Sequence, residues 1–161
     1  MAENADGAFT YPVREEFRDV EYVAISCSAS VDFTNEHDYI CVKAVDSNYN
    51  SEWATLKGGV ETWIVLEMEG EEAVAMNKME FRNRNVVRNH RVRLTFSDES
   101  QQWVDLDDTS VPVTYDLAPV TARWVRIAVE SVYSAGDNGA REIKFFNDTA
   151  EVSIGAYMLY Q

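Results

Sequence analysis

The segment Arg91-Val92-Arg93-Leu94-Thr95-Phe96 alternates polar and apolar side chains with a period of two residues. This period is typical of a β-strand that has one face in the core and the other in solvent. The run Trp124-Val125-Arg126-Ile127-Ala128-Val129 is rich in β-branched and aromatic residues and predicts a second strand. Similar runs predict strands over residues 21–26, 39–45, 62–68, 73–81, 111–117, 142–146 and 152–160.

Short polar turns separate these runs, and no long segment shows the helical period. The turns are Lys57-Gly58-Gly59, Ser97-Asp98-Glu99-Ser100, Asp107-Asp108-Thr109-Ser110 and Gly136-Asp137-Asn138-Gly139. Many short strands with this spacing predict an all-β fold, an antiparallel β-sandwich. We predict one domain over residues 21–147, an N-terminal extension over 1–20, and a C-terminal extension strand over 148–161 packed on the same domain.

The composition limits the classes of partner. A chain of 161 residues that is 46% hydrophobic can bury a core without help from a metal or disulfides. Twenty-eight acidic residues against 14 basic ones give a net charge of −14, which argues against binding to nucleic acid or anionic membranes. No apolar run is long enough to span a membrane. Residues 1–7 lack the features of a signal peptide, so an intracellular location is predicted.

The two cysteines, Cys27 and Cys41, both lie in apolar, strand-like runs. In such a position a free cysteine behaves as a small hydrophobic residue. A disulfide between them is the alternative in an oxidising compartment, and the sequence leaves both states open.

The segment 44–53 carries three oxygen donors, Asp46, Asn48 and Ser51, directly after an apolar run. Trp53 closes this segment and offers a large ring to the core. Short side chains and carbonyls in a tight loop suit a hard cation such as Ca²⁺. The alternative is an ordinary turn in which Asp46 and Asn48 bond their own backbone.

Four segments in order resemble the discoidin domain, also called the coagulation factor five/eight type C domain, of the galactose-binding-like superfamily. They are residues 44–53, residues 63–68 (Trp-Ile-Val-Leu-Glu-Met), residues 91–103 ending in Ser-Asp-Glu-Ser-Gln-Gln-Trp, and residues 119–127 followed by Arg141-Glu142-Ile143. The resemblance implies a jelly-roll sandwich. It also implies a structural Ca²⁺ held by Lys43 (through its carbonyl), Asp46, Asn48, Ser51 and Glu142. Ser47 stands where the family has glycine, and serine is strained there if the position requires a positive φ.

In the family, loops at the rim of the sandwich hold the ligands. The candidate ligand-binding residues here are Phe33, His37, Arg84 and Asn85, from residues 32–38 and 82–90. A hexose site needs hydrogen-bond donors for neighbouring hydroxyls and an aromatic face against the ring. The alternative is that these are ordinary solvated loop residues.

Residues 82–93 carry five arginines and no acidic residue. Arg91 and Arg93 are explained by the outward face of a strand. Arg82, Arg84 and Arg88 predict a basic face that binds an acidic protein partner, and pairing with surface carboxylates is the alternative.

No catalytic motif is present and the chain has only two histidines, so we predict a non-catalytic protein. The main functional prediction is an interaction module, a small intracellular subunit or adaptor of a larger protein assembly. Precedents in the resembled family place such subunits in the cytoplasm or in ciliary and axonemal complexes. The alternative is a lectin-like protein that binds galactose-type glycans.

Overall fold

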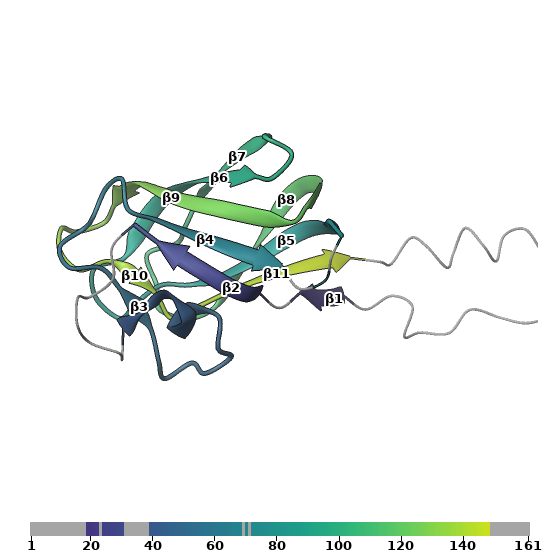
Figure 1. Cartoon of the computed structure of the whole chain (residues 1–161). Helices are drawn as coiled ribbons and strands as arrows, with labels where there is room; N and C mark the ends of the chain where they lie inside the picture. Colours follow the sequence, from purple (N-terminus) through teal and green to yellow (C-terminus); the bar gives the residue numbers. More distant parts are fainter. Residues whose placement is uncertain (1–18, 23, 31–38, 69, 71, 149–161) are drawn as a thin grey trace, which may run out of the picture.

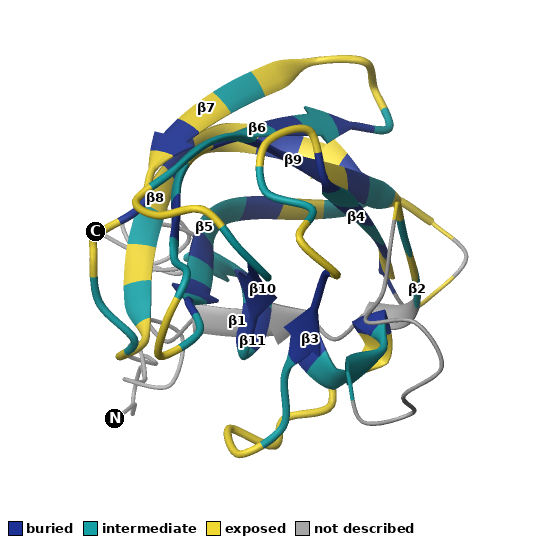
Figure 2. Ribbon diagram, turned by 90° about the vertical axis from the view of Figure 1, so that its left-hand side faces the viewer, coloured by how far each residue is buried: buried dark blue, intermediate teal, exposed yellow. Residues whose placement is uncertain are grey.

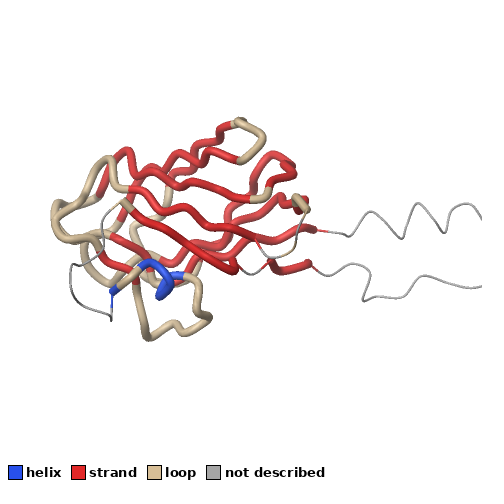
Figure 3. Tube along the Cα trace, viewed as in Figure 1, coloured by secondary structure: helices blue, strands red, loops and turns tan. Residues whose placement is uncertain are grey.

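The structure, a computed structural model, describes residues 19–22, 24–30, 39–68, 70 and 72–148. The predicted ligand residues Phe33 and His37 and the predicted strand over 152–160 lie outside the described residues. Within them, two antiparallel sheets pack face to face and form the predicted β-sandwich (Figure 1). Strands make up most of the described chain, as Figure 3 shows.

The first sheet has four strands, in the spatial order β1 (Asp19–Tyr22), β11 (Glu142–Asp148), β5 (Val74–Arg82) and β8 (Val113–Ala122). The second has five, in the order β2 (Ala24–Ala29), β4 (Trp63–Met68), β9 (Trp124–Val132), β6 (Asn89–Phe96) and β7 (Gln101–Asp105). A short pair, β10 (Gly139–Ala140) with β3 (Trp53–Ala54), lies at one end of the sandwich (Figure 1). All strand pairs are antiparallel.

The alternation read in residues 91–96 is confirmed. Val92, Leu94 and Phe96 are completely buried, whereas Arg91 is exposed. Buried residues of both sheets line the space between the layers, as the dark blue segments in Figure 2 show. Trp53 is also buried in this core, as predicted.

The predicted strand over residues 39–45 is wrong. A 3₁₀-helix, η3 (Cys41–Ala44), takes its place. Cys41 and Ala44 are buried and Val42 between them is exposed, so the apolar residues follow the three-residue period of a 3₁₀-helix. A short apolar run does not by itself distinguish these two periods.

A disulfide joins Cys27 of β2 to Cys41 of η3, with the two Cα atoms 6.2 Å apart. Of the two states that the sequence left open, free cysteines or a disulfide, the structure has the disulfide. The bond ties the 3₁₀-helix to the edge strand of the five-stranded sheet, and so fixes the start of the loop that follows η3.

A buried network of side-chain amides holds the β3–β10 end of the sandwich. The Asn138 amide donates to Oδ1 of Asn89 at 2.8 Å and to the Thr62 hydroxyl at 3.0 Å, and its Oδ1 accepts from the Thr55 hydroxyl at 2.6 Å. Asn89 donates in turn to Oδ1 of Asn83 at 3.2 Å. These buried groups therefore satisfy one another and connect loops that are distant in sequence.

Gly139 is required by the close pairing of β10 with β3. A Cβ atom at this position would lie 1.9 Å from the carbonyl oxygen of Trp53. The glycine thus allows β10 to approach the strand that follows the oxygen-rich loop. Within the described part of the chain, none of the helical structure has the length and apolar character needed to cross a membrane.

Candidate functional site

The loop between η3 and β3 gathers the predicted oxygen donors around the Ser51 hydroxyl. The Ser51 Oγ lies 2.6 Å from Oδ2 of Asp46, 3.0 Å from the Asn48 carbonyl oxygen and 3.5 Å from the Lys43 carbonyl oxygen. Four oxygen atoms from four residues therefore converge on one point of the loop.

The Asx turns named as the alternative are also present. Oδ1 of Asp46 accepts from the Asn48 N–H at 3.0 Å, and Oδ1 of Asn48 accepts from the Asn50 N–H at 2.9 Å. Ser47 has a φ of 60°, so the position does require the left-handed conformation that favours glycine. The turns shape the loop and leave Oδ2 of Asp46 directed at Ser51.

Glu142, the first residue of β11, brings a second carboxylate to this loop. Its side chain is 1% exposed and accepts a hydrogen bond from the Ser47 N–H, while its Oε1 has no hydrogen-bond partner. Burial raises the pKa of Glu142 to about 7, with Lys144 opposing the shift and Asp46 and Glu80 adding to it.

The five predicted cation ligands are thus brought together at one rim of the sandwich. Among the described residues, no group of three or more His, Cys, Asp or Glu side chains could hold a metal ion. A cation at this loop would therefore need carbonyl and hydroxyl oxygens in addition to the Asp46 and Glu142 carboxylates. A buried carboxylate oxygen without a partner, next to a loop of convergent oxygens, is a donor set that suits Ca²⁺.

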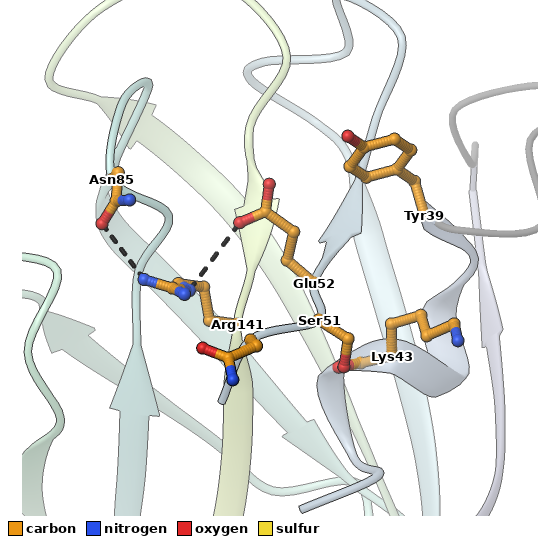
Figure 4. Close-up of a pocket in the computed structure, with 7 residues that line it drawn as sticks. Tyr39, Lys43, Ser51, Glu52, Asn85 and Arg141 are labelled. Atoms are coloured by element: carbon orange, nitrogen blue, oxygen red, sulfur yellow. Dashed lines mark hydrogen bonds and ion pairs between the residues drawn. The ribbon is translucent and has the colours of Figure 1, made fainter. Parts of the chain in front are cut away.

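A polar pocket of about 460 Å³ lies beside this oxygen cluster. Figure 4 shows Asn85 and Arg141 on one side, Tyr39 and Lys43 on the other, and Glu52 and Ser51 between them. Its volume falls within the roughly 300–1,000 Å³ usual for small-ligand sites.

The donors and acceptors of the pocket are held in place by one another. Nη1 of Arg141 donates to Oδ1 of Asn85 at 3.1 Å, and its Nε lies 3.9 Å from Oε1 of Glu52 (Figure 4). Oε2 of Glu52 accepts from Nε of Arg84 at 2.9 Å. The pocket therefore presents fixed polar groups opposite the Tyr39 ring.

Two of the four predicted ligand residues are described by the structure, and only one of them lines the pocket. Asn85 lines the pocket, whereas Arg84 pairs with Glu52 and donates to the Asp137 carbonyl oxygen, so Arg84 positions Glu52.

The three arginines predicted to bind a partner have partners within the molecule. Nε of Arg82 donates to the Ser110 carbonyl at 2.8 Å, Arg84 pairs with Glu52, and Nη1 of Arg88 lies 3.1 Å from Oδ1 of Asp108. For Arg84 and Arg88 this arrangement matches the surface-pairing alternative, whereas the partner of Arg82 is a backbone carbonyl. The basic face for an acidic partner stays a prediction.

Sequence reasoning missed Tyr39, Glu52 and Arg141 as pocket residues. A signal for two of them was present, because Glu52 follows Ser51 and Arg141 precedes Glu142. Ser51 lines the pocket as well, so the sequence marks Glu52 and Arg141 only by their position next to predicted cation ligands.

The structure is a β-sandwich with a polar pocket and an oxygen-rich loop at one rim. Residues 24–143 match the family model of the F5/8 type C domain, and because this is well over half of the chain, the protein belongs to that family. A comparison with curated proteins gave no match.

Solved structures of similar fold include modules bound to sugars. The family 32 CBM of C. perfringens NanJ, in complex with galactose, is 15% identical with a TM-score of 0.62, covering 78% of this chain and 99% of that one. CpGH89CBM32-5 from Clostridium perfringens, in complex with GalNAc-β-1,3-galactose, is 17% identical with a TM-score of 0.62, covering 74% and 93%.

A truncated AlyQ with CBM32 and alginate lyase domains is 19% identical with a TM-score of 0.62, covering 81% of this chain. The present chain spans only 34% of that two-domain protein. The similarity of all three structures establishes the fold. The neighbours named here are binding modules, one of them joined to an enzyme, and they give no support to a ciliary or axonemal adaptor.

Proposed function

We propose that this protein is a non-catalytic carbohydrate-binding module that holds a saccharide in the pocket between Tyr39 and Arg141. The observation that carries the proposal is that one pocket joins an aromatic side chain with fixed donors and acceptors on Arg141, Asn85 and Glu52. An aromatic face covers the apolar side of a sugar ring, and such polar groups bond its hydroxyls. The sugar-bound neighbours support this class of ligand.

Titration calorimetry against a panel of neutral and acidic saccharides tests the proposal. Asn85→Ala and Arg141→Gln should each weaken binding at least about tenfold, because each removes a polar group from the pocket. Arg91→Gln is the matched control, since Arg91 is an exposed arginine of β6 that does not line the pocket. Equal binding by all four proteins would contradict the proposal.

We also propose that the oxygen cluster holds a structural Ca²⁺. Lys43 (through its carbonyl), Asp46, Asn48, Ser51 and Glu142 are the ligands. The bound ion would neutralise the two carboxylates and tie the loop after η3 to the first residue of β11. The support for this proposal is the buried Glu142 Oε1 that has no hydrogen-bond partner.

Thermal unfolding with and without Ca²⁺ tests this second proposal. We expect Ca²⁺ to raise the Tm of the wild type and to have no effect on Asp46→Asn or Glu142→Gln. Asp116→Asn, at an exposed site on β8, should respond as the wild type does. No shift at millimolar Ca²⁺ in the wild type would contradict it.

The Cys27–Cys41 disulfide bears on where the module works. Structural disulfides persist in oxidising compartments and are rare in the cytosol. We therefore infer an oxidising environment, and the intracellular location expected from residues 1–7 stays an untested prediction. Mass spectrometry of protein alkylated in its source cells distinguishes the two locations, because a cytosolic protein would carry two alkylated cysteines.

A further inference from the structure

A second pocket, of about 280 Å³, adjoins the polar pocket, because Asn85 lines both. Oδ1 of Asn85 accepts from Arg141 in the polar pocket, whereas the backbone carbonyl of Asn85 accepts from Nη2 of Arg88, which lines the second pocket, at 2.8 Å. The second pocket is slightly smaller than the roughly 300–1,000 Å³ of complete small-ligand sites. Its size therefore suits one part of a ligand whose other part lies in the polar pocket.

The two charged residues that line the second pocket, Arg88 and Asp108, pair with each other. Nη1 of Arg88 lies 3.1 Å from Oδ1 of Asp108, and Nε of Arg88 donates to the Arg84 carbonyl oxygen at 3.2 Å. With the bond to the Asn85 carbonyl, all three guanidinium nitrogens of Arg88 donate within the molecule. The pair leaves the second pocket without net charge, so the pocket favours an uncharged group over an ion.

The rest of the second pocket is mainly apolar, with Val86, Val87 and Tyr133 in its lining. Val86 and Tyr133 are 63% and 42% exposed. The Tyr133 ring is fixed, because its hydroxyl donates to the Leu106 carbonyl oxygen at 2.6 Å and its centroid lies 4.7 Å from that of the His90 ring. Val87 has a φ of 54°, which is rare for a β-branched residue, and such strained residues cluster at ligand sites. A fixed ring loses little conformational freedom when a ligand covers it, so this surface suits an apolar ring.

We propose that the second pocket binds the apolar aglycone of a glycoside whose sugar occupies the polar pocket. This inference rests on the proposed function, because it extends the same site to the group that is attached to the sugar. The glycosidic bond would pass Asn85, the residue that the two pockets share. The preferred ligand is then a glycoside that carries an aromatic or other compact apolar group, in preference to the free sugar.

Calorimetry tests this inference with the methyl and phenyl glycosides, in both anomeric forms, of the sugar that binds most tightly in the saccharide panel. The two glycosides share the sugar and differ only in the aglycone. For at least one anomer, we expect the phenyl glycoside to bind about five- to tenfold more tightly than the methyl glycoside, because the phenyl ring is removed from water. Val86→Ser and Tyr133→Ala should each lower this phenyl-to-methyl affinity ratio at least about twofold, because each removes apolar surface from the second pocket.

Val111→Ser is the matched control, because Val111 is an exposed valine that lines neither pocket, and it should leave the ratio unchanged. If Tyr133→Ala does not fold, the highly exposed Val86 decides the test. Equal affinity for the phenyl and methyl glycosides of both anomers, or a ratio that Val86→Ser does not change, would overturn the inference and leave the proposed function standing. Absence of binding to every saccharide of the panel would overturn both.

Discussion

Nη2 of Arg84 lies 2.8 Å from Oε2 of Glu52, in an ion pair whose side chains are 15% and 20% exposed. The pair joins the loop after β5 to the residue that precedes β3. The pair positions Glu52, which is the one carboxylate among the described residues that line the polar pocket.

Breaking this ion pair should destabilise the protein measurably. In a double-mutant cycle with Arg84→Ala and Glu52→Ala, we expect a coupling energy of about 1–3 kcal/mol, because the pair is largely removed from solvent. Urea denaturation of the four proteins gives this energy. A coupling below about 0.3 kcal/mol would show that the contact does not fix Glu52.

Asn138→Ala should lower the free energy of unfolding by at least about 2 kcal/mol. The change leaves the buried Thr55 hydroxyl, the Asn89 Oδ1 and the Gly59 N–H without their partner. Thermal unfolding should show a fall in Tm of roughly 4–8 °C.

Gln101→Ala serves as the control for this amide, since the Gln101 side chain donates to the Thr95 hydroxyl at an exposed site on the sheet. Its Tm should stay within about 1–2 °C of the wild type. Equal effects of the two substitutions would mean that the buried network contributes nothing beyond an ordinary surface amide.

The stability of the cation-free protein should fall as the pH rises from about 4.5 to about 7. The pKa of Glu142 is raised from 4.5 to about 7, so between these values the folded protein binds a proton that the unfolded chain has released. The loss at pH 7 and above is up to about 3 kcal/mol. Chemical denaturation across this range, with a chelator present, measures it.

Glu142→Gln keeps the shape of the side chain and removes its ionisation. We expect the pH dependence between 4.5 and 7 to become flatter than in the wild type, and the variant to be the more stable of the two at pH 8 without Ca²⁺. Identical pH profiles for both proteins would show that Glu142 is not the group responsible.

The disulfide should stabilise the fold by about 3 kcal/mol, as expected for the 14-residue separation of Cys27 and Cys41. Cys27→Ser with Cys41→Ser should lower the Tm, and a dithiol reductant should do the same to the wild type and have no effect on the variant. A reductant effect on the variant would indicate that the agent acts elsewhere.

The sandwich could be predicted from the sequence because its strands carry the period-two pattern over five or more residues, as in residues 91–96. The oxygen cluster could be predicted for two reasons. Asp46, Asn48 and Ser51 are close in sequence, and the family resemblance added Glu142. Lys43 was predicted for its carbonyl oxygen, and the same residue also lines the pocket.

The pocket could not be predicted in the same way, because it depends on contacts between distant residues. Arg84 and Glu52 are 32 residues apart, and Arg141 and Asn85 are 56 apart. The 3₁₀-helix was missed because four residues are too few to separate its period from that of a strand.

Chemical-shift perturbation can locate saccharide binding at the rim pocket residue by residue. In ¹⁵N-labelled protein titrated with a methyl galactoside, binding of the saccharide in this pocket should give saturable shifts centred on Tyr39, Glu52, Asn85 and Arg141. Shifts centred on another face of the sandwich, or no saturable shift with any saccharide, would contradict it.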